Sequence, residues 1–361
     1  MDTTYEKDKL LSKMASHLRS ENTLPSSTNL IGAITFWLYI IAALGLTSIV
    51  VRAIYNTPCP PSTKRQQGIF ACLALLSFGT LSWNMLNVLI QSYLHWAQDH
   101  HISLPTTLYG GAHGPVQTPL HLLSWSTTST LFTDFGVAIF ATPSRIVWTN
   151  VSLWLTLLNI LYISVTGRTT HQIPKSTLWA MIGVAEILPI SFTQNLFYLL
   201  LLRRRRRQGQ SSRIESKVTG MPNIWTLVTI LCTYQACLMY APFLAGKSSS
   251  HSNLVLLILF ARTLLLLPMF IPLYSPSPSR VSAASSRSRT GSTTIGSFTV
   301  RDIVVIFTAV VTVGSTVHAV REGVSLSELV RAVNTHPAVS ALGYDFLISV
   351  LSWGLWYTMG L

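Results

Sequence analysis

Long blocks of apolar residues are the feature that most limits how this chain of 361 residues folds. A helix needs about 20 apolar residues to cross the hydrocarbon core of a bilayer, and blocks near this length recur along the sequence. Charged residues make up only 10% of the chain, against about 25% in a typical soluble domain. The sequence therefore predicts an all-α fold, a polytopic bundle of transmembrane helices.

Eight of these blocks are clear enough to be predicted as spans. A ninth, weaker block at 122–141 is rich in hydroxyl side chains, and is compatible with a span, a re-entrant segment or an interfacial helix. The eight clear blocks cover residues 30–54, 69–94, 146–166, 177–202, 223–245, 253–274, 300–320 and 339–359.

The rest of the chain suggests one domain with two polar appendages. Residues 1–28 form a polar tail without the apolar core and cleavage site of a signal peptide, so the first span is expected to direct insertion. Residues 29–361 form a single transmembrane domain. Within it, the Ser/Arg/Pro-rich segment 275–299 is predicted to be a disordered loop.

The net charge of +13 comes mainly from the connections between blocks. Basic connections are typical of the cytosolic side of a membrane and of contact with anionic lipid, so nucleic acid is not needed to explain them. The connection with Arg203–Arg207 and the 275–299 loop are predicted to be cytosolic, and the loop with Lys247 to lie opposite. The side of the N-terminus depends on whether 122–141 crosses. We expect a multi-pass protein of the endoplasmic reticulum.

Three acidic residues, Asp134, Glu186 and Asp345, lie deep within apolar blocks. A charged carboxylate at mid-membrane costs about 2.5–3.5 kcal/mol, which favours its neutral, protonated form. Arg262 is the only basic residue at such depth, so it can neutralise one acid at most. Acids inside a membrane are functional by default, and these three are the candidate catalytic residues.

Polar residues at helical spacing accompany these acids. Such stripes serve either as hydrogen-bonding contacts between helices or as the lining of a shared chamber. With nearby aromatic side chains, they give the candidate substrate-binding residues Trp83, Asn84, Asn87, Gln91, Trp125, Asn159, Gln194, Asn195, Tyr344, Ser349 and Trp353.

Motifs for other chemistries are absent from the sequence. It has no paired-aspartate motif for a magnesium diphosphate, no G-x-S-x-G, H-E-x-x-H or Walker sequence, and no metal-type spacing of its four cysteines. We therefore expect neither a metal nor another cofactor. Isolated carboxyls among amides, hydroxyls and aromatic faces suit acid-initiated cyclisation of an isoprenoid chain, in which aromatic rings stabilise the cation.

Three stretches resemble segments of the fungal integral-membrane terpene cyclases of meroterpenoid pathways, in particular the larger type of ascofuranone- and macrophorin-like biosynthesis. They are LFTDFGVAIFA (131–141), AEILPISFTQNLFYLLLL (185–202) and LGYDFLISVLSWGLW (342–356). The resemblance implies a metal-independent cyclase of a farnesylated aromatic compound or its terminal epoxide. By motif position it carries over the same three acids, with Gln194 and Asn195 as polar partners. An upstream prenyltransferase and epoxidase are the implied pathway partners.

The main alternative is a proton-coupled carrier of a small hydrophobic molecule, because intramembrane acids also relay protons. A carrier predicts an internal repeat with paired half-helices, and no convincing repeat appears in the sequence. A purely structural or receptor-like role for the acids is a third hypothesis.

Overall fold

A computed structural model describes residues 30–58, 63–100, 124–128, 131–169, 173–211, 221–222, 224–247, 251–270, 273–274 and 300–359. The predicted tail 1–28 and the predicted loop 275–299 lie outside these residues. The described chain is helical apart from turns and two short strands, β1 (Met221–Pro222) and β2 (Leu273–Tyr274), which pair antiparallel.

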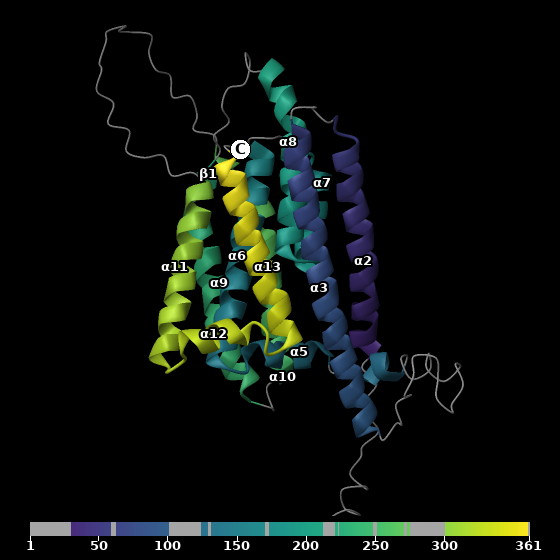
Figure 1. Ribbon diagram of the computed structural model, residues 1–361, viewed down its shortest axis with the longest axis vertical. Coiled ribbons are helices and arrows are strands. Elements are labelled where there is room, and N and C mark those ends of the chain that lie inside the picture. The colour runs from purple at the N-terminus through teal and green to yellow at the C-terminus, as the bar shows by residue number, and fades with distance from the viewer. Residues whose placement is uncertain are drawn as a thin grey trace, which may run out of the picture. The chain divides into compact units, whose positions relative to one another are not determined.

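Each of the eight predicted blocks contains helix, although the block at 253–274 ends in β2 (Figure 1). Among the described residues, six helical segments are long and apolar enough to cross a membrane, which supports a multi-pass membrane protein. The helices are α2 (Leu30–Tyr55), α3 (Lys64–Asp99), α5 (Leu131–Phe140), α6 (Pro143–Thr169), α7 (Lys175–Ile187), α8 (Ile190–Ser211), α9 (Ile224–Ala245), α10 (His251–Leu266) with the 3-10 turn η3 (Leu267–Met269), α11 (Val300–Arg321), α12 (Leu326–Ala332) and α13 (Pro337–Thr358).

The chain divides into two compact units. The first comprises 1–38 and 91–131, and its described part contains an aromatic cluster in which Tyr93 packs edge-on against Trp125. In the same cluster Trp96 donates a hydrogen bond to Thr128. The second unit comprises 39–90 and 132–361 and contains the candidate site described below.

Helix α6 is the central element of the second unit. It contacts α7, α8, α11, α12 and α13, and its middle, including Leu158, Ile160 and Ile163, is fully buried. A helix that is apolar on every face is stable only where other elements or lipid surround it. Neighbouring helices therefore surround α6, whereas α2 exposes most of its apolar residues.

The prediction of one continuous span over 177–202 is wrong. Helix α7 ends at Ile187, Leu188 is extended, and α8 begins at Ile190. Pro189 explains the break, since proline lacks an N–H and clashes with the preceding turn of a helix. The structure therefore replaces the predicted span with two half-helices.

These half-helices form a re-entrant hairpin that enters and leaves at one end of the unit. Helix α7 starts beside the end of α6, where Leu178 lies against Gly167. The return helix α8 reaches the end of α2, where Arg203 donates hydrogen bonds to the carbonyls of Ile54 and Thr57. The intervening break lies beside Asp345, the ninth residue of α13 and about 12 Å along that helix at 1.5 Å per residue.

The weak block 122–141 contains α5, which is too short to cross a bilayer. Helix α5 lies across the ends of the longer helices (Figure 1). Its carbonyls at Ala138 and Ile139 accept hydrogen bonds from Arg145 and Thr149 in the first turns of α6. Of the three alternatives for this block, the structure supports an interfacial helix.

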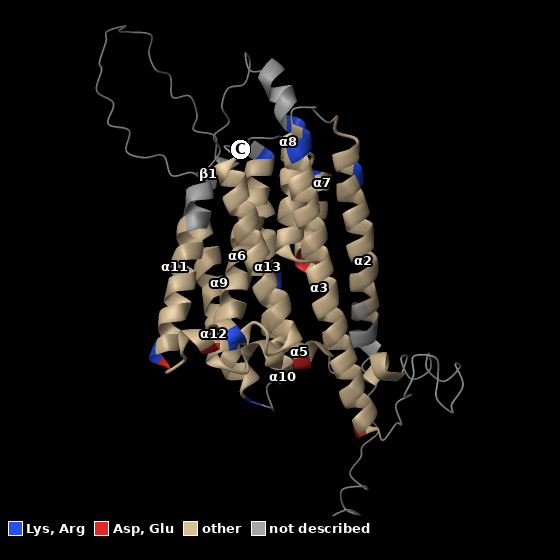
Figure 2. Cartoon of the chain, viewed as in Figure 1, with Lys and Arg blue, Asp and Glu red and all other residues tan. Residues whose placement is uncertain are grey.

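Basic residues gather at the end where the hairpin opens, and Figure 2 shows charges of both signs at the other end. The C-terminal part of α13 also reaches the basic end, because Trp356 stacks on Tyr198 one turn before Arg203. Helix α2 ends there. The basic residues at this end include Arg52, Lys64, Arg65, Arg168, Lys175 and Arg203–Arg207.

We expect the basic end to face the cytosol, because positively charged connections are retained there. The N-terminus should then face the lumen and the C-terminus the cytosol. A glycosylation sequon in an extension before Met1 should be modified in cells, and the same extension after Leu361 should not. This orientation requires α11, a shorter apolar helix over Ile306–Arg321, to cross in addition to the six longer segments, and the hairpin not to cross. Modification at both ends, or at neither, would contradict it.

The start of α13 carries a titratable cap outside the apolar span. The Nδ1 atom of His336 accepts a hydrogen bond of 3.1 Å from the backbone N–H of Ala338. Burial and, secondarily, the nearby Arg145 lower the pKa of His336. The folded protein therefore disfavours the protonated ring, which also cannot accept this hydrogen bond.

Below about pH 6.5, the ordinary pKa of histidine, the unfolded chain should bind this proton more readily than the folded protein. The free energy of unfolding should therefore fall as pH decreases. His336→Asn keeps a capping oxygen that does not titrate. Melting temperatures measured in detergent at pH 7.5 and 5.5 should differ less for this variant than for the wild type. Equal differences would show that His336 does not contribute to the pH dependence.

Candidate active site at the break between α7 and α8

Asp345 of α13 caps the N-terminus of α8 with both carboxylate oxygens. Oδ2 accepts the backbone N–H of Ile190 at 3.0 Å, and Oδ1 accepts the backbone N–H of Ser191 at 2.8 Å. The Ser191 hydroxyl donates a further hydrogen bond to Oδ1 at 2.5 Å. The first N–H groups of a helix have no partner within the helix, and the helix dipole favours negative charge there. Asp345 thus satisfies polar groups that the break would otherwise leave bare.

The cap extends to α3 and thereby ties three elements together. The hydroxyls of Ser77 and Ser191 share a short hydrogen bond, and the neighbouring rings of Phe78 and Phe192 pack at 5.6 Å. Both serines are buried. The start of α8 is therefore fixed by polar contacts to α13 and α3.

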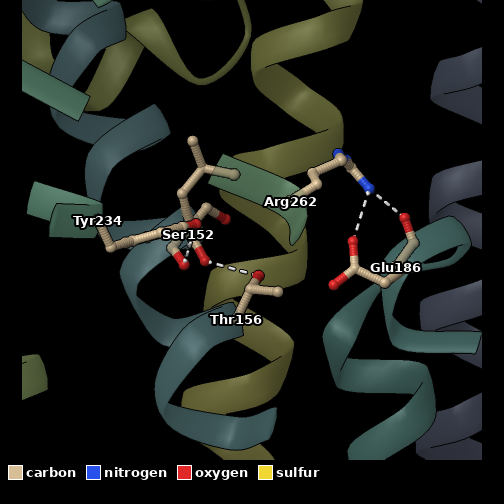
Figure 3. Close-up of polar contacts among 6 residues, drawn as sticks. Ser152, Thr156, Glu186, Tyr234 and Arg262 are labelled. Atoms are coloured by element: carbon tan, nitrogen blue, oxygen red, sulfur yellow. Dashed lines mark hydrogen bonds and ion pairs between the residues drawn. The ribbon is translucent and has the colours of Figure 1, made fainter. Parts of the chain in front are cut away.

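Glu186 lies on the other side of the break, in the last turn of α7. Its backbone carbonyl accepts a hydrogen bond from Nη1 of Arg262 on α10, and its Oε2 atom lies 3.6 Å from the same nitrogen. Figure 3 shows the arginine extending from α10 to both acceptors. At 3.6 Å the carboxylate contact is an ion pair and not a hydrogen bond. The predicted neutralisation of one acid by Arg262 thus falls on Glu186.

Several buried polar atoms around the break have no hydrogen-bond partner within the described part of the chain. They are Oε1 of Glu186, Oγ1 of Thr193 and Oδ1 of Asn195. Thr193 and Asn195 lie in the first turns of α8 and are fully buried. Because an unpaired buried polar group costs about 1–3 kcal/mol, a cluster of them marks a place where a bound molecule or water can supply partners.

Beyond this cluster, a hydrogen-bonded network joins α6, α8 and α13. Asn159 donates to the Ser349 hydroxyl and accepts from Nε1 of Trp353, and Gln194 exchanges hydrogen bonds with Ser349. These four candidate substrate-binding residues do come together. They bond to one another, as expected for contacts that hold membrane helices together.

A group of stacked aromatic rings continues from this network toward the basic end. Tyr198 lies parallel to Trp356 with ring centroids 4.3 Å apart, and Tyr162 lies 4.8 Å from Trp353. Phe70 packs edge-on against both Tyr198 and Trp356. The faces of these rings largely pack against one another.

Asp134, the third predicted acid, lies away from the break. It is exposed in the first turn of α5, and α5 packs against the first turns of α6 and α10 at the end of the bundle. Glu186 and Asp345 therefore flank one site, while the catalytic role of Asp134 stays a prediction.

The remaining candidate residues are spread along the chain. Trp83 is exposed on the outside of α3, and the Asn84 amide donates to the Thr80 carbonyl of its own helix. Tyr344 donates to Asn334 in the turn before α13. Asn87 is half-buried on α3, whereas Gln91 and Trp125 belong to the first unit. Of the two roles left open for the polar stripes, these placements favour contacts within and between helices over a lining shared by all of them.

Sequence reasoning missed the residues that complete the site. Ser77 and Ser191 look like ordinary small polar residues, and Tyr234 like an ordinary aromatic residue of α9. Tyr234 donates a hydrogen bond to the Leu153 carbonyl (Figure 3). The only sequence signal was Pro189, because a proline favours the start of a new helix, and a new helix needs a capping side chain.

Comparisons with family models, with curated proteins and with solved structures found no match for this chain. Within the described residues, no three His, Cys, Asp or Glu side chains lie together as a metal site requires. The chemistry of the site is therefore inferred from the residues around the break.

The cap predicts a clear order of stability. Asp345→Ala should lower the free energy of unfolding by about 2 kcal/mol, because two helix N–H groups lose their acceptor. Asp345→Asn retains one acceptor oxygen and should lie between Ala and the wild type. Apparent melting temperatures in detergent would measure this, with the exposed Glu322→Gln as the matched control. Wild-type stability of Asp345→Ala would contradict the capping role.

Proposed function

We propose that this protein is a membrane-bound terpene cyclase that uses Glu186 as the acid which starts cyclisation of a farnesylated aromatic compound. The observation that carries the proposal is the buried, unpartnered Oε1 of Glu186 beside a helix break deep in the bundle. A carboxyl oxygen without an internal partner is available to a substrate atom. The resemblance of the three sequence segments supports the same class of reaction.

The two acids at the break differ in their surroundings, and this separates their roles. Asp345 accepts hydrogen bonds from two backbone N–H groups and a hydroxyl, all of which favour its charged form. Glu186 has one cation at 3.6 Å and one vacant oxygen. Glu186 is therefore the better proton donor, and Asp345 is a positioning residue that holds the break.

The proposed reaction begins when the Glu186 carboxyl gives its proton to the oxygen of a terminal epoxide. The C–O bond breaks, and the electron pairs of the chain's double bonds form the ring bonds in turn. A C–H proton is lost at the end and restores Glu186 for the next turnover, so the overall reaction is an isomerisation. Arg262 stabilises the Glu186 carboxylate that exists between these two proton transfers.

A proton-coupled carrier is the second candidate, and the re-entrant hairpin is the observation in its favour. In many carriers the N-terminus of a half-helix at mid-membrane binds an anionic group of the substrate. Here the N-terminus of α8 already holds the Asp345 carboxylate. The place that an anionic substrate would occupy is therefore filled, which favours the cyclase.

Microsomes expressing the protein would be incubated with a farnesyl-phenol and with its terminal epoxide, and the products measured by chromatography and mass spectrometry. Wild type should cyclise the epoxide, and Glu186→Gln should reduce the rate at least about 100-fold, since general acid catalysis contributes about 10²–10⁴-fold. The exposed Glu322→Gln is the control and should react like wild type. Full activity of Glu186→Gln would show that Glu186 is not the acid that starts the reaction. A proton-dependent flux of the compound across the membrane, without any cyclic product, would favour the carrier.

A further inference from the structure

Arg262 has hydrogen-bonding capacity that its pairing with Glu186 does not use. A guanidinium carries five N–H donors. In the described part of the chain, only Nη1 has partners, the carbonyl and the carboxylate of Glu186. Nε and both N–H groups of Nη2 are left without an acceptor there.

The position of Arg262 makes this unused capacity costly. It is the twelfth residue of α10, about 17 Å from the start of the helix at 1.5 Å per residue. An arginine at the centre of a membrane costs about 2.5–3.5 kcal/mol on insertion scales. The phosphates of lipid headgroups stay at the membrane surface, outside the hydrocarbon core, so they do not supply a partner at this depth.

The guanidinium is also accessible. Its side chain is 40% exposed, against 14% for Glu186. The exposed neighbours on α10 are the apolar Leu259 and Phe260 and also Thr263, whose hydroxyl donates to the carbonyl of Phe260. Helix α10 contacts α7, and nearer the basic end Trp179 of α7 packs against Phe270 at 5.2 Å. A hydrophobic molecule can therefore reach Arg262 along an apolar surface where α7 and α10 meet.

Charge balance then indicates the ligand, and this step depends on the proposed function. As a proton donor, Glu186 must be neutral, and neutral Glu186 leaves the charge of Arg262 uncompensated in a medium of low dielectric. An aromatic carboxylate would compensate it and would accept two parallel N–H bonds from the guanidinium. A phenol group is neutral at pH 7 and would not.

We propose that Arg262 is a substrate-binding residue that anchors the carboxylate of a prenylated aromatic acid, and that the bound anion helps to keep Glu186 protonated. The anchored head group places the isoprenoid chain beside the vacant Oε1 of Glu186. The anion adds a like charge next to Glu186 and draws Arg262 away from it, and both effects favour the neutral acid.

Binding of a farnesylated hydroxybenzoic acid and of its methyl ester to the purified full-length protein in nanodiscs tests this inference. The acid should bind at least about tenfold more tightly than the ester, because a charge-assisted bidentate contact is lost in the ester. In Arg262→Gln this preference should disappear, while Arg321→Gln, an exposed arginine at the end of α11, should retain it. Arg262→Lys keeps the charge without the planar fork and should retain part of the preference, which also controls for misfolding.

Equal binding of acid and ester by the wild type, or an unchanged preference in Arg262→Gln, would overturn the inference. Palmitate serves as a second probe for a fatty acid taken from the bilayer. Binding of palmitate as tight as that of the aromatic acid would also overturn it, because the site would then not select a prenylated aromatic. The binding measurement involves no turnover. Tight binding of the acid, together with no cyclic product from the epoxide in the microsome assay, would therefore reject the proposed reaction and leave the anchoring site intact.

Discussion

The hydrogen bonds between Asp345 and the first N–H groups of α8 are the interaction on which the arrangement of this bundle depends. A helix that starts deep within an apolar bundle exposes N–H groups that neither lipid nor apolar side chains can satisfy. Asp345 supplies two acceptor oxygens at that point, and Ser191 adds a third hydrogen bond. Without this carboxylate, the backbone N–H groups of Ile190 and Ser191 would lose their acceptor at the start of α8. The cap therefore stabilises the hairpin, and the hairpin brings Glu186 to the interior.

The same hairpin accounts for the distribution of charge. Because α7 and α8 both open at one end, the five arginines after Leu202 join the basic ends of α2 and α6 there. Arg203 also has a structural role at this end, since its guanidinium donates hydrogen bonds to the carbonyls that end α2 and to Gln67. Within the described residues, most of the Lys and Arg residues thus lie on one side, which is consistent with a single orientation in the membrane. The sequence left the side of the N-terminus open because the crossing of 122–141 was undecided, and the break between α7 and α8 adds a second change to the count of crossings.

The sequence predicted the helical membrane class and the positions of the helices well, because apolar length alone determines them. It could not predict the hairpin. A proline within an apolar block permits either a kink or a full break, and the choice depends on Asp345, which lies more than 150 residues away in the chain. For the site, helical spacing correctly grouped Asn159, Gln194, Ser349 and Trp353, yet it could not distinguish residues that line a space from residues that bond to one another. Trp83 was misplaced for a related reason, since periodicity identifies a face of a helix but not what covers it.

Glu186 and Arg262 illustrate how function and stability are connected at this site. An ion pair that is only partly formed, with one carboxyl oxygen and three N–H groups unused, is a weak structural contact. It makes fewer hydrogen bonds than the complete cap at Asp345 does, and it leaves groups available to a ligand. The two acids therefore divide the tasks of holding the break and reacting beside it.

The distance between the two ends of the hairpin tests the central claim most directly. Spin labels would be placed on Lys175 at the start of α7 and on Arg204 in α8, and their separation measured by pulsed electron resonance in nanodiscs. The re-entrant arrangement predicts a distance below about 25 Å, because both positions lie at the same membrane surface. A continuous helix through these 30 positions would separate the labels by about 40 Å. A distance near that larger value would contradict the hairpin and with it the site at the break.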